Sequence, residues 1–241
     1  MKMEELYEDK LAVLIDIENA QYHLIKEVLD EIAKYGTTII KRAYGDWTSE
    51  TAKNWKEKLI DYAITPIQQF SYTQRKNSSD IALVIDAMDL LHTAELDGFC
   101  LISSDSDFTH LAKRIRESGL KVYGFGEQKT PLALQKACDR FIFVEILRND
   151  NQKRLMQKND QELEEIFTSA LKGTMQDDGY SHLGAVGIYI RHNRPSFDPR
   201  NYGYDKMGDL VRNLTFLKIQ RREDDKGGSN IFITHNQNGS Y

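Results

Sequence analysis

The stretch GFCLISSDSDFTHL, residues 98–111, joins a strand-like run to the start of a helix. Its apolar run ends at Ile102, polar residues occupy 103–107, and apolar residues at helical spacing follow. A nearly continuous apolar run is typical of a strand that is buried on both faces of a parallel sheet. We therefore expect a β-strand and a following α-helix, joined by a loop that carries Asp105 and Asp107.

This alternation of strand and helix repeats from residue 10 to residue 147. Strand-like segments cover 10–17, 37–47, 64–72, 98–104, 121–126 and 140–146. Helix-like segments lie between them at 20–35, 49–63, 78–94, 107–118 and 130–138. Repeated β–α units predict an α/β fold with a Rossmann-like, doubly wound parallel sheet, whose site lies at the carboxyl ends of the strands.

The rest of the chain has a different pattern. Residues 148–160 are polar and charged and are predicted to be a linker between a domain at 1–147 and a second domain at 161–241. In the second domain, helical patterns cover 161–173, 182–193 and 205–214, the last with Asp205 as its expected N-cap. Two strand-like segments, 216–222 and 230–235, then flank a turn. Three short helices and a hairpin predict a small winged helix-turn-helix domain.

Composition limits the class of protein. The 241 residues are 40% hydrophobic with a net charge of −5, and no apolar run reaches the length of about 20 residues that a membrane span needs. The acidic N-terminus lacks the apolar core of a signal peptide, so we expect a cytoplasmic protein without a membrane partner. Cys100 and Cys138 each stand in an apolar run and are too few for a cysteine-based zinc site.

Carboxylates follow the predicted strands in a pattern that suggests a metal site. Asp16 ends the first strand, Asp105 and Asp107 follow the fourth, and Asp80 stands in the opening turn of a helix. In a doubly wound sheet the first and fourth strands are commonly neighbours, which would bring these acids into one pocket. Carboxylates placed so close together favour a divalent, oxygen-seeking ion such as Mg²⁺ or Mn²⁺. Asn19 would orient a ligand or a metal-bound water, so the arrangement suggests metal-assisted phosphodiester hydrolysis.

Simpler roles exist for some of these acids. Asp107 alone could be a helix N-cap, and Asp80 could complement a helix dipole. Capping does not explain Asp16, which follows an apolar run. Asp86 lies about 240° around the helix from Asp80 and should therefore face away from the pocket, so it is only a secondary candidate. Asp89 ranks lower still. The sequence has no phosphate-binding loop, nucleophile elbow or clustered histidines, which excludes those other site classes.

Four separated blocks, VLIDIENA, RAYGDW, SSDIALVIDAMD and LISSDSDFTHL, together resemble the NYN domain. This PIN-like nuclease domain belongs to the LabA group, and the resemblance covers about residues 10–147. It implies the fold of a metal-dependent ribonuclease. The acidic site of the family maps onto Asp16, Asp80, Asp105 and Asp107, with Asn19 beside them.

The second domain resembles the OST-HTH/LOTUS domain, a winged-helix RNA-binding module. The resemblance covers about residues 160–236 and rests on HLGAVGIYI, on RPSFDPRNYGYDKMGDLVRNL and on the hairpin after them. It implies that this domain selects or delivers RNA to the nuclease domain.

Basic and aromatic residues are the predicted RNA contacts. Residues 181–222 contain eight Lys or Arg against three Asp or Glu. Arginines can pair with phosphates, and aromatic rings can stack on unpaired bases. The candidates in the second domain are Arg191, Arg194, Arg200, Tyr202, Lys206 and Arg212. Those in the first domain are Lys41, Arg42, Arg75 and Lys76.

The sequence thus predicts a cytoplasmic metal-dependent endoribonuclease with a C-terminal RNA-binding domain. One alternative is a non-catalytic RNA-binding adaptor with a vestigial acidic pocket. Another is a metal-dependent DNA or nucleotide phosphodiesterase, and an intact helix-turn-helix leaves DNA binding open. The sequence leaves undecided the RNA target, the number of metal ions and the oligomeric state, a homodimer included.

Overall fold

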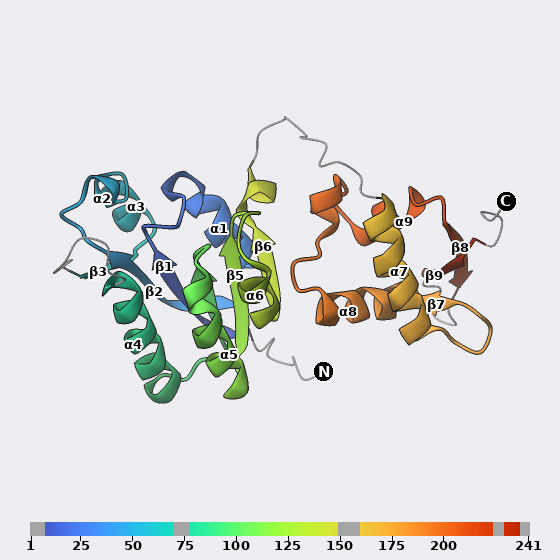
Figure 1. Cartoon of the computed structure of the whole chain (residues 1–241), viewed down its shortest axis with the longest axis horizontal. Coiled ribbons are helices and arrows are strands. Elements are labelled where there is room, and N and C mark those ends of the chain that lie inside the picture. Colours follow the sequence, from blue (N-terminus) through green and yellow to red (C-terminus); the bar gives the residue numbers. More distant parts are fainter. Residues whose placement is uncertain (1–7, 70–77, 149–159, 224–228, 237–241) are drawn as a thin grey trace, which may run out of the picture. The chain divides into compact units, whose positions relative to one another are not determined.

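The computed structural model of the chain divides into two compact units, residues 1–149 and 150–241 (Figure 1). Each unit has hydrophobic clusters of its own. The structure describes residues 8–69, 78–148, 160–223 and 229–236.

A six-stranded parallel sheet forms the centre of the first unit, with the strand order β3-β2-β1-β4-β5-β6. Its strands are β1 (Lys10–Asp16), β2 (Thr37–Gly45), β3 (Thr65–Gln68), β4 (Gly98–Ile102), β5 (Lys121–Gly126) and β6 (Arg140–Phe143). The chain builds one half of the sheet outward from β1 and then returns to build the other half outward from β4. This topology confirms the predicted doubly wound α/β fold and places β1 beside β4, where the strand order reverses.

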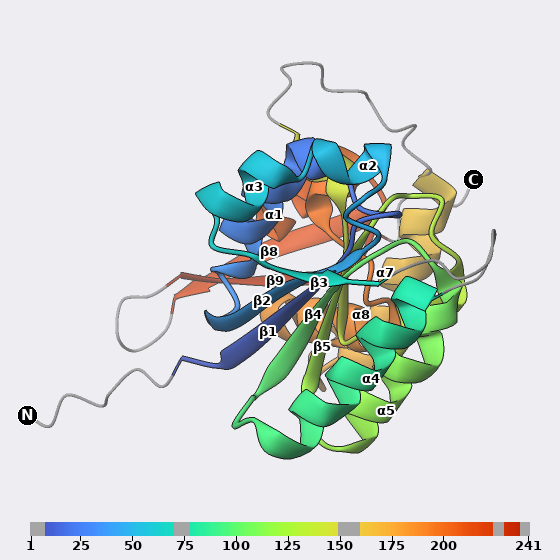
Figure 2. The same cartoon turned by 90° about the vertical axis from the view of Figure 1, so that its left-hand side faces the viewer.

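Alternate side chains of the central strands face two separate cores. Leu11, Val13 and Ile15 of β1 belong to one hydrophobic cluster, and Ala12 and Leu14 to the other. The first cluster packs against α1 (Ile25–Ile32), α2 (Glu50–Lys53) and α3 (Lys56–Asp61), and the second against α4 (Ser78–Thr93), α5 (Thr109–Glu117) and α6 (Leu132–Ala137). Figure 2 shows α1 to α3 on one side of the sheet and α4 and α5 on the other. Short 3-10 turns cover Tyr22–Leu24, Ser106–Phe108 and Val144–Leu147.

The single helix predicted for 49–63 is divided into α2 and α3. The helix stops at Lys53, and Trp55, whose side chain is fully buried, stands between the two helices. The large ring packs into the first core together with Ala52 of α2 and Leu59 of α3. The hydrophobic periodicity therefore located the segment correctly, but it did not reveal the break at Trp55.

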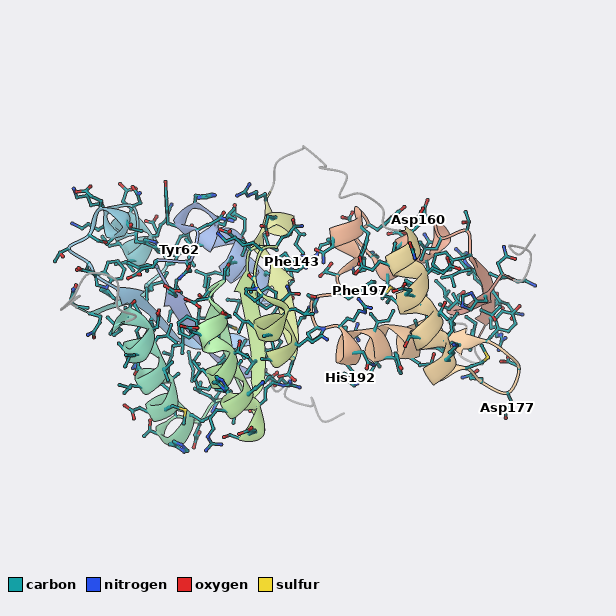
Figure 3. The ribbon with its side chains drawn as sticks, in the orientation of Figure 1. Tyr62, Phe143, Asp160, Asp177, His192 and Phe197 are labelled. Atoms are coloured by element: carbon teal, nitrogen blue, oxygen red, sulfur yellow. The ribbon has the colours of Figure 1, made fainter. Side chains whose placement is uncertain are left out.

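The second unit packs three helices against one face of a small antiparallel sheet with the strand order β7-β9-β8. Its elements are α7 (Asp160–Thr174), β7 (Ser181–His182), α8 (Leu183–Asn193), a 3-10 turn (Pro199–Tyr202), α9 (Met207–Arg212), β8 (Leu217–Glu223) and β9 (Ser229–His235). The three helices and the hairpin agree with the predicted winged-helix arrangement, while the two-residue strand β7 was not predicted. Phe197, labelled in Figure 3, packs with Phe167 in the core of this unit.

The predicted N-cap of the third helix is wrong. Lys206, and not Asp205, precedes α9, and its side chain makes no capping hydrogen bond. In the part of the chain that the structure describes, no helix combines the length and the apolar character that crossing a bilayer requires.

Candidate active site

A buried carboxylate ends β1. Asp16 is 1% exposed and lies at the carboxyl edge of the sheet. Its carboxylate accepts hydrogen bonds from Asn19 Nδ2 at 2.8 Å, from Ser103 Oγ at 2.8 Å and from the backbone N–H of Glu18 at 3.0 Å. Burial raises the pKa of Asp16, and the hydrogen bonds from Asn19 and Ser103 oppose this rise. The hydrogen bonds hold the carboxylate in one orientation and favour its ionised form.

The loop after β4 carries two more acids and is joined to Asp16 through Ser103. The hydroxyl of Ser103, a buried residue, also accepts a hydrogen bond from the backbone N–H of Asp105 at 3.0 Å. Asp105 Oδ1 in turn accepts the backbone N–H of Asp107 at 2.9 Å and caps the 3-10 turn that begins at Ser106. The capping that the sequence suggested for Asp107 is therefore made by Asp105.

Asp80 lies in the first turn of α4 and is partly exposed. Loss of hydration raises its pKa to about 6, and the nearby negative charges of Asp16, Asp105, Glu18 and Asp107 add to the rise. Asp80 therefore stands in the field of the other acids, although it is at least 25 residues away from each of them along the chain. Asp16, Asp105 and Asp107, the other acids singled out from the sequence, are thus near enough to act on Asp80 electrostatically.

Two neighbouring residues were not among the predicted site residues. Ser79 Oγ donates a hydrogen bond to Glu18 Oε1 at 3.2 Å, which links the start of α4 to the loop after β1. Ser103, described above, links Asp16 to Asp105. The sequence showed only that Glu18 follows Asp16 by two residues and that Ser103 ends a predicted strand, and it did not show the partner of either side chain.

The donor atoms at this edge of the sheet are the oxygens that Mg²⁺ and Mn²⁺ prefer. Within the described residues, however, no three Asp, Glu, His or Cys side chains are grouped so that they could hold one metal ion. Mg²⁺ commonly binds through one or two carboxylates, keeps several waters and shares phosphate oxygens of the substrate. The residues therefore fit an ion held by one or two carboxylates together with water, and not an ion enclosed by protein ligands.

Two of the four basic residues predicted in the first unit, Lys41 and Arg42, have partners of their own. Arg42 forms an ion pair with Asp86 of α4, and the phenol of Tyr44 donates a hydrogen bond to the same carboxylate. Lys41 donates to the backbone carbonyl of Tyr62. Asp86, the secondary candidate, thus ties α4 to β2. Arg75 and Lys76 lie outside the described residues.

The predicted RNA contacts of the second unit divide into paired and unpaired groups. Arg200 Nε and Nη2 donate to the two carboxylate oxygens of Asp198 at 2.9 and 2.8 Å, and Tyr202 packs against the core, where burial raises its pKa to about 12. Arg194 Nη1 forms an ion pair with Glu162 Oε1 at 3.5 Å. Arg212 Nη1 forms one with Asp209 Oδ1 at 2.7 Å. Among the described residues, no carboxylate forms an ion pair with the two remaining candidates, Arg191 and Lys206.

Comparison with known domain families agrees with this geometry. Residues 10–146 match the NYN domain and residues 154–228 match the OST-HTH/LOTUS domain. The chain belongs to the NYN domain family. NYN domains are PIN-like nucleases. The match confirms the resemblance to the NYN domain that rested on four sequence blocks, and it also confirms the resemblance of the second domain to the OST-HTH/LOTUS domain.

Individual relatives are distant. The uncharacterized protein MJ0482 of Methanocaldococcus jannaschii is 28% identical over 145 residues, which span 57% of this chain and 56% of that protein. A Vibrio parahaemolyticus protein of unknown function, VPA0982, is 20% identical, with a TM-score of 0.47 over 58% of this chain and 94% of its own. The solution structure of residues 175–257 of a Chromobacterium violaceum protein is 35% identical, with a TM-score of 0.29 over 33% of this chain and 85% of its own. Because both TM-scores are below 0.5, family membership rests on the two domain matches.

Proposed function

We propose that the chain is a metal-dependent endoribonuclease that hydrolyses RNA phosphodiester bonds and uses its OST-HTH/LOTUS domain to bind RNA. The observation that carries this proposal is the buried carboxylate of Asp16, which Asn19 and Ser103 hold in place. The pKa of nearby Asp80 is raised by loss of hydration and, to a smaller extent, by the charges of the surrounding acids. Such a concentration of negative charge is unfavourable without a cation. Its occurrence at the switch point of an NYN domain supports a catalytic use.

Asp16 and Asp105 are the residues that would hold a Mg²⁺ or Mn²⁺ ion, with Asp80 and Asp107 acting directly or through water. When bound, such an ion lowers the pKa of a water molecule and stabilises negative charge on a phosphoryl oxygen. The protein's own contribution is orientation. Asn19 and Ser103 fix the carboxylate of Asp16, and Ser103 also fixes the start of the loop that carries Asp105.

Asp80 is suited to a different task, because its pKa of about 6 lies near neutral pH. A group that titrates in this range can accept a proton from an attacking water or return one to a leaving oxygen. Binding of a cation nearby would lower this pKa again, since the positive charge favours the ionised form. Asp80 is thus a candidate both for a metal ligand and for a general base.

Cleavage assays with metal and carboxylate variants test this proposal. Labelled single-stranded RNA, structured RNA and DNA of the same sequence would be incubated with the full chain in Mn²⁺, Mg²⁺ or EDTA. We expect RNA cleavage with either ion, none in EDTA, and none by Asp16→Asn, whose side chain is nearly isosteric. Asp89→Asn is the matched control, because Asp89 is an exposed acid on the same helix as Asp80. Equal cleavage by Asp16→Asn and the unmodified chain would refute the assignment, and cleavage of DNA alone would make the enzyme a deoxyribonuclease.

A non-catalytic RNA-binding adaptor is the second candidate. One observation favours it, since the described residues contain no group of three acids, histidines or cysteines that could ligate a single ion. The same assays separate the two functions. RNA binding without turnover in any metal would support the adaptor, and turnover that depends on Asp16 would exclude it.

A further inference from the structure

The antiparallel sheet of the second unit has one face against the core, and on its other face the structure describes no helix (Figure 1). Ile233 of β9 pairs with Ser181 and Ile219 on the side that packs against the core. Side chains alternate along a strand, so the neighbours of these residues point the other way. This second side, here called the outer sheet face, consists of His182, Lys218, Gln220, Arg222, Asn230, Phe232 and Thr234. Figure 1 shows α7, α8 and α9 together on one side of β8 and β9.

The outer sheet face carries aromatic rings that do not belong to the core. Phe232 and the adjoining Tyr180 are absent from the hydrophobic cluster of this unit and are partly exposed. The ring of His182 meets that of Phe232 edge to face, with 5.3 Å between centroids. The guanidinium carbon of Arg222 lies 4.1 Å from the centroid of Phe232 and 5.1 Å from that of Tyr180. Two aromatic rings, an imidazole and a guanidinium group thus form one continuous π surface.

Hydrogen bonds hold these groups in place. Arg222 Nη1 lies 2.5 Å from Asp178 Oδ2, and its Nη2 donates to Gln220 Oε1 at 2.8 Å. His182 Nδ1 accepts the backbone N–H of Gly184 at 3.2 Å, and its Nε2 lies 3.3 Å from Asn230 Oδ1. A surface whose rings are already oriented loses little conformational entropy when a flat ligand stacks on it.

The charge of the face suits an anionic ligand. Asp178 compensates Arg222, whereas Lys218 is exposed and, within the described residues, has no carboxylate partner. The remaining members are the ring of Phe232, an imidazole, amides and a hydroxyl, so most of the face is polar, unlike the apolar centre of a protein–protein interface. Polar groups, one lysine and oriented rings instead match unpaired nucleotides, whose bases stack on aromatic and guanidinium planes.

We propose that the outer sheet face binds single-stranded RNA. Bases stack against the surface formed by His182, Phe232, Tyr180 and Arg222, and Lys218 contacts a phosphate. This proposal rests on the proposed function, in which RNA is the substrate. It goes beyond that function because it names a binding surface, whereas the sequence suggested Arg191, Arg194 and other residues on or near the helices. This sheet face is a separate surface.

Binding assays in EDTA measure this interaction without cleavage. Fluorescence anisotropy with a labelled oligouridine would compare the full chain with Phe232→Leu, which keeps an apolar side chain but removes the ring, and with Lys218→Ala. Ile188→Ala on α8 and Lys172→Ala on α7 are the matched controls, because both residues are exposed and belong to helices. We expect Phe232→Leu to weaken binding about tenfold. Lys218→Ala should reduce the slope of log affinity against log salt by about 1. Both controls should bind like the unmodified chain.

Cross-linking gives a readout that does not depend on variants. Irradiation of the complex with a thiouridine-containing oligonucleotide should place adducts on Tyr180, His182 or Phe232. If both variants bind RNA as well as the unmodified chain, or if the adducts lie only on α8 and α9, the proposal is overturned. If Phe232→Leu fails to fold, Lys218→Ala and the adduct positions decide. Absence of any RNA binding would overturn this proposal and the RNA-binding role of the second domain, while metal-dependent cleavage is judged by its own assay.

Discussion

Replacing Asp80 by Asn should stabilise the first unit at neutral pH when no divalent ion is present. The pKa of Asp80 in the folded protein is about 6, above the value of 3.8 expected for an unperturbed aspartate. Each pKa unit corresponds to about 1.4 kcal/mol, so full ionisation of Asp80 would cost about 3 kcal/mol in an unscreened site. Solvent screening at a partly exposed side chain and the favourable position at the N-terminus of α4 both reduce this cost. We therefore expect a gain of about 1 kcal/mol, or about 3 °C in melting temperature.

The pH dependence has a definite sign. Because the folded pKa of Asp80 is raised, its contribution to stability is complete below pH 3.8 and is lost as pH rises through about 6. The advantage of Asp80→Asn should thus appear above pH 6 and fade toward pH 4. Urea denaturation in EDTA, followed by tryptophan fluorescence, reports this unit, because Trp47 and Trp55 are the two tryptophans of the chain. Asp89→Asn is the control. An Asp80→Asn variant no more stable than the unmodified chain at pH 8 would refute the electrostatic reasoning, and so would an equal gain at pH 4.

Two further substitutions test positioning residues. Ser103→Ala should lower the rate of metal-dependent cleavage about 10- to 100-fold, as the loss of a hydrogen bond to a metal ligand does in other metal sites. If kcat/KM of Ser103→Ala equals that of the unmodified chain, Ser103 does not orient Asp16 and Asp105. Arg42→Ala should destabilise the first unit by about 1–3 kcal/mol and leave RNA affinity unchanged, since it removes the positive partner of the Asp86 carboxylate and leaves the Tyr44 hydroxyl as its described donor. A double-mutant cycle with Asp86→Ala measures the coupling, and a selective loss of RNA affinity in Arg42→Ala would show that the arginine contacts RNA after all.

Sequence patterns were sufficient for most of the fold. Strands β1 and β4 are short apolar runs, α4 is a long apolar segment and α7 is amphipathic, so each could be placed from neighbouring residues alone. The helix break at Trp55 and the missed strand β7 occurred where packing or pairing with other elements decides the local structure. The burial of Trp55 accompanies the break between α2 and α3, and β7 is a strand only because Ser181 and His182 pair with β9.

The acids of the candidate site were chosen from the sequence, and their role stays a prediction, whereas the hydrogen bonds that connect them were not foreseen. Asp16, Asp80, Asp105 and Asp107 were recognisable because an acid after a buried strand, or in a first helical turn, can be read locally. Ser103 was not, because its importance lies in a hydrogen bond to a residue 87 positions away. Predictions from charge alone were the least informative about RNA binding, since an exposed arginine and an arginine paired with a carboxylate look alike in a sequence.

The sequence by itself determined the alternation of strands and helices, the division into two domains with NYN and OST-HTH/LOTUS motifs, and the identity of the acids at strand ends. These features depend on residues close together in the chain. Only the tertiary structure decided that Ser103 joins Asp16 to Asp105, that Asp86 holds Arg42, and that Phe232 and Arg222 meet on the outer sheet face. The physical reason is that hydrogen bonds, ion pairs and ring contacts act over a few ångströms in space, and the packing of distant elements sets those distances.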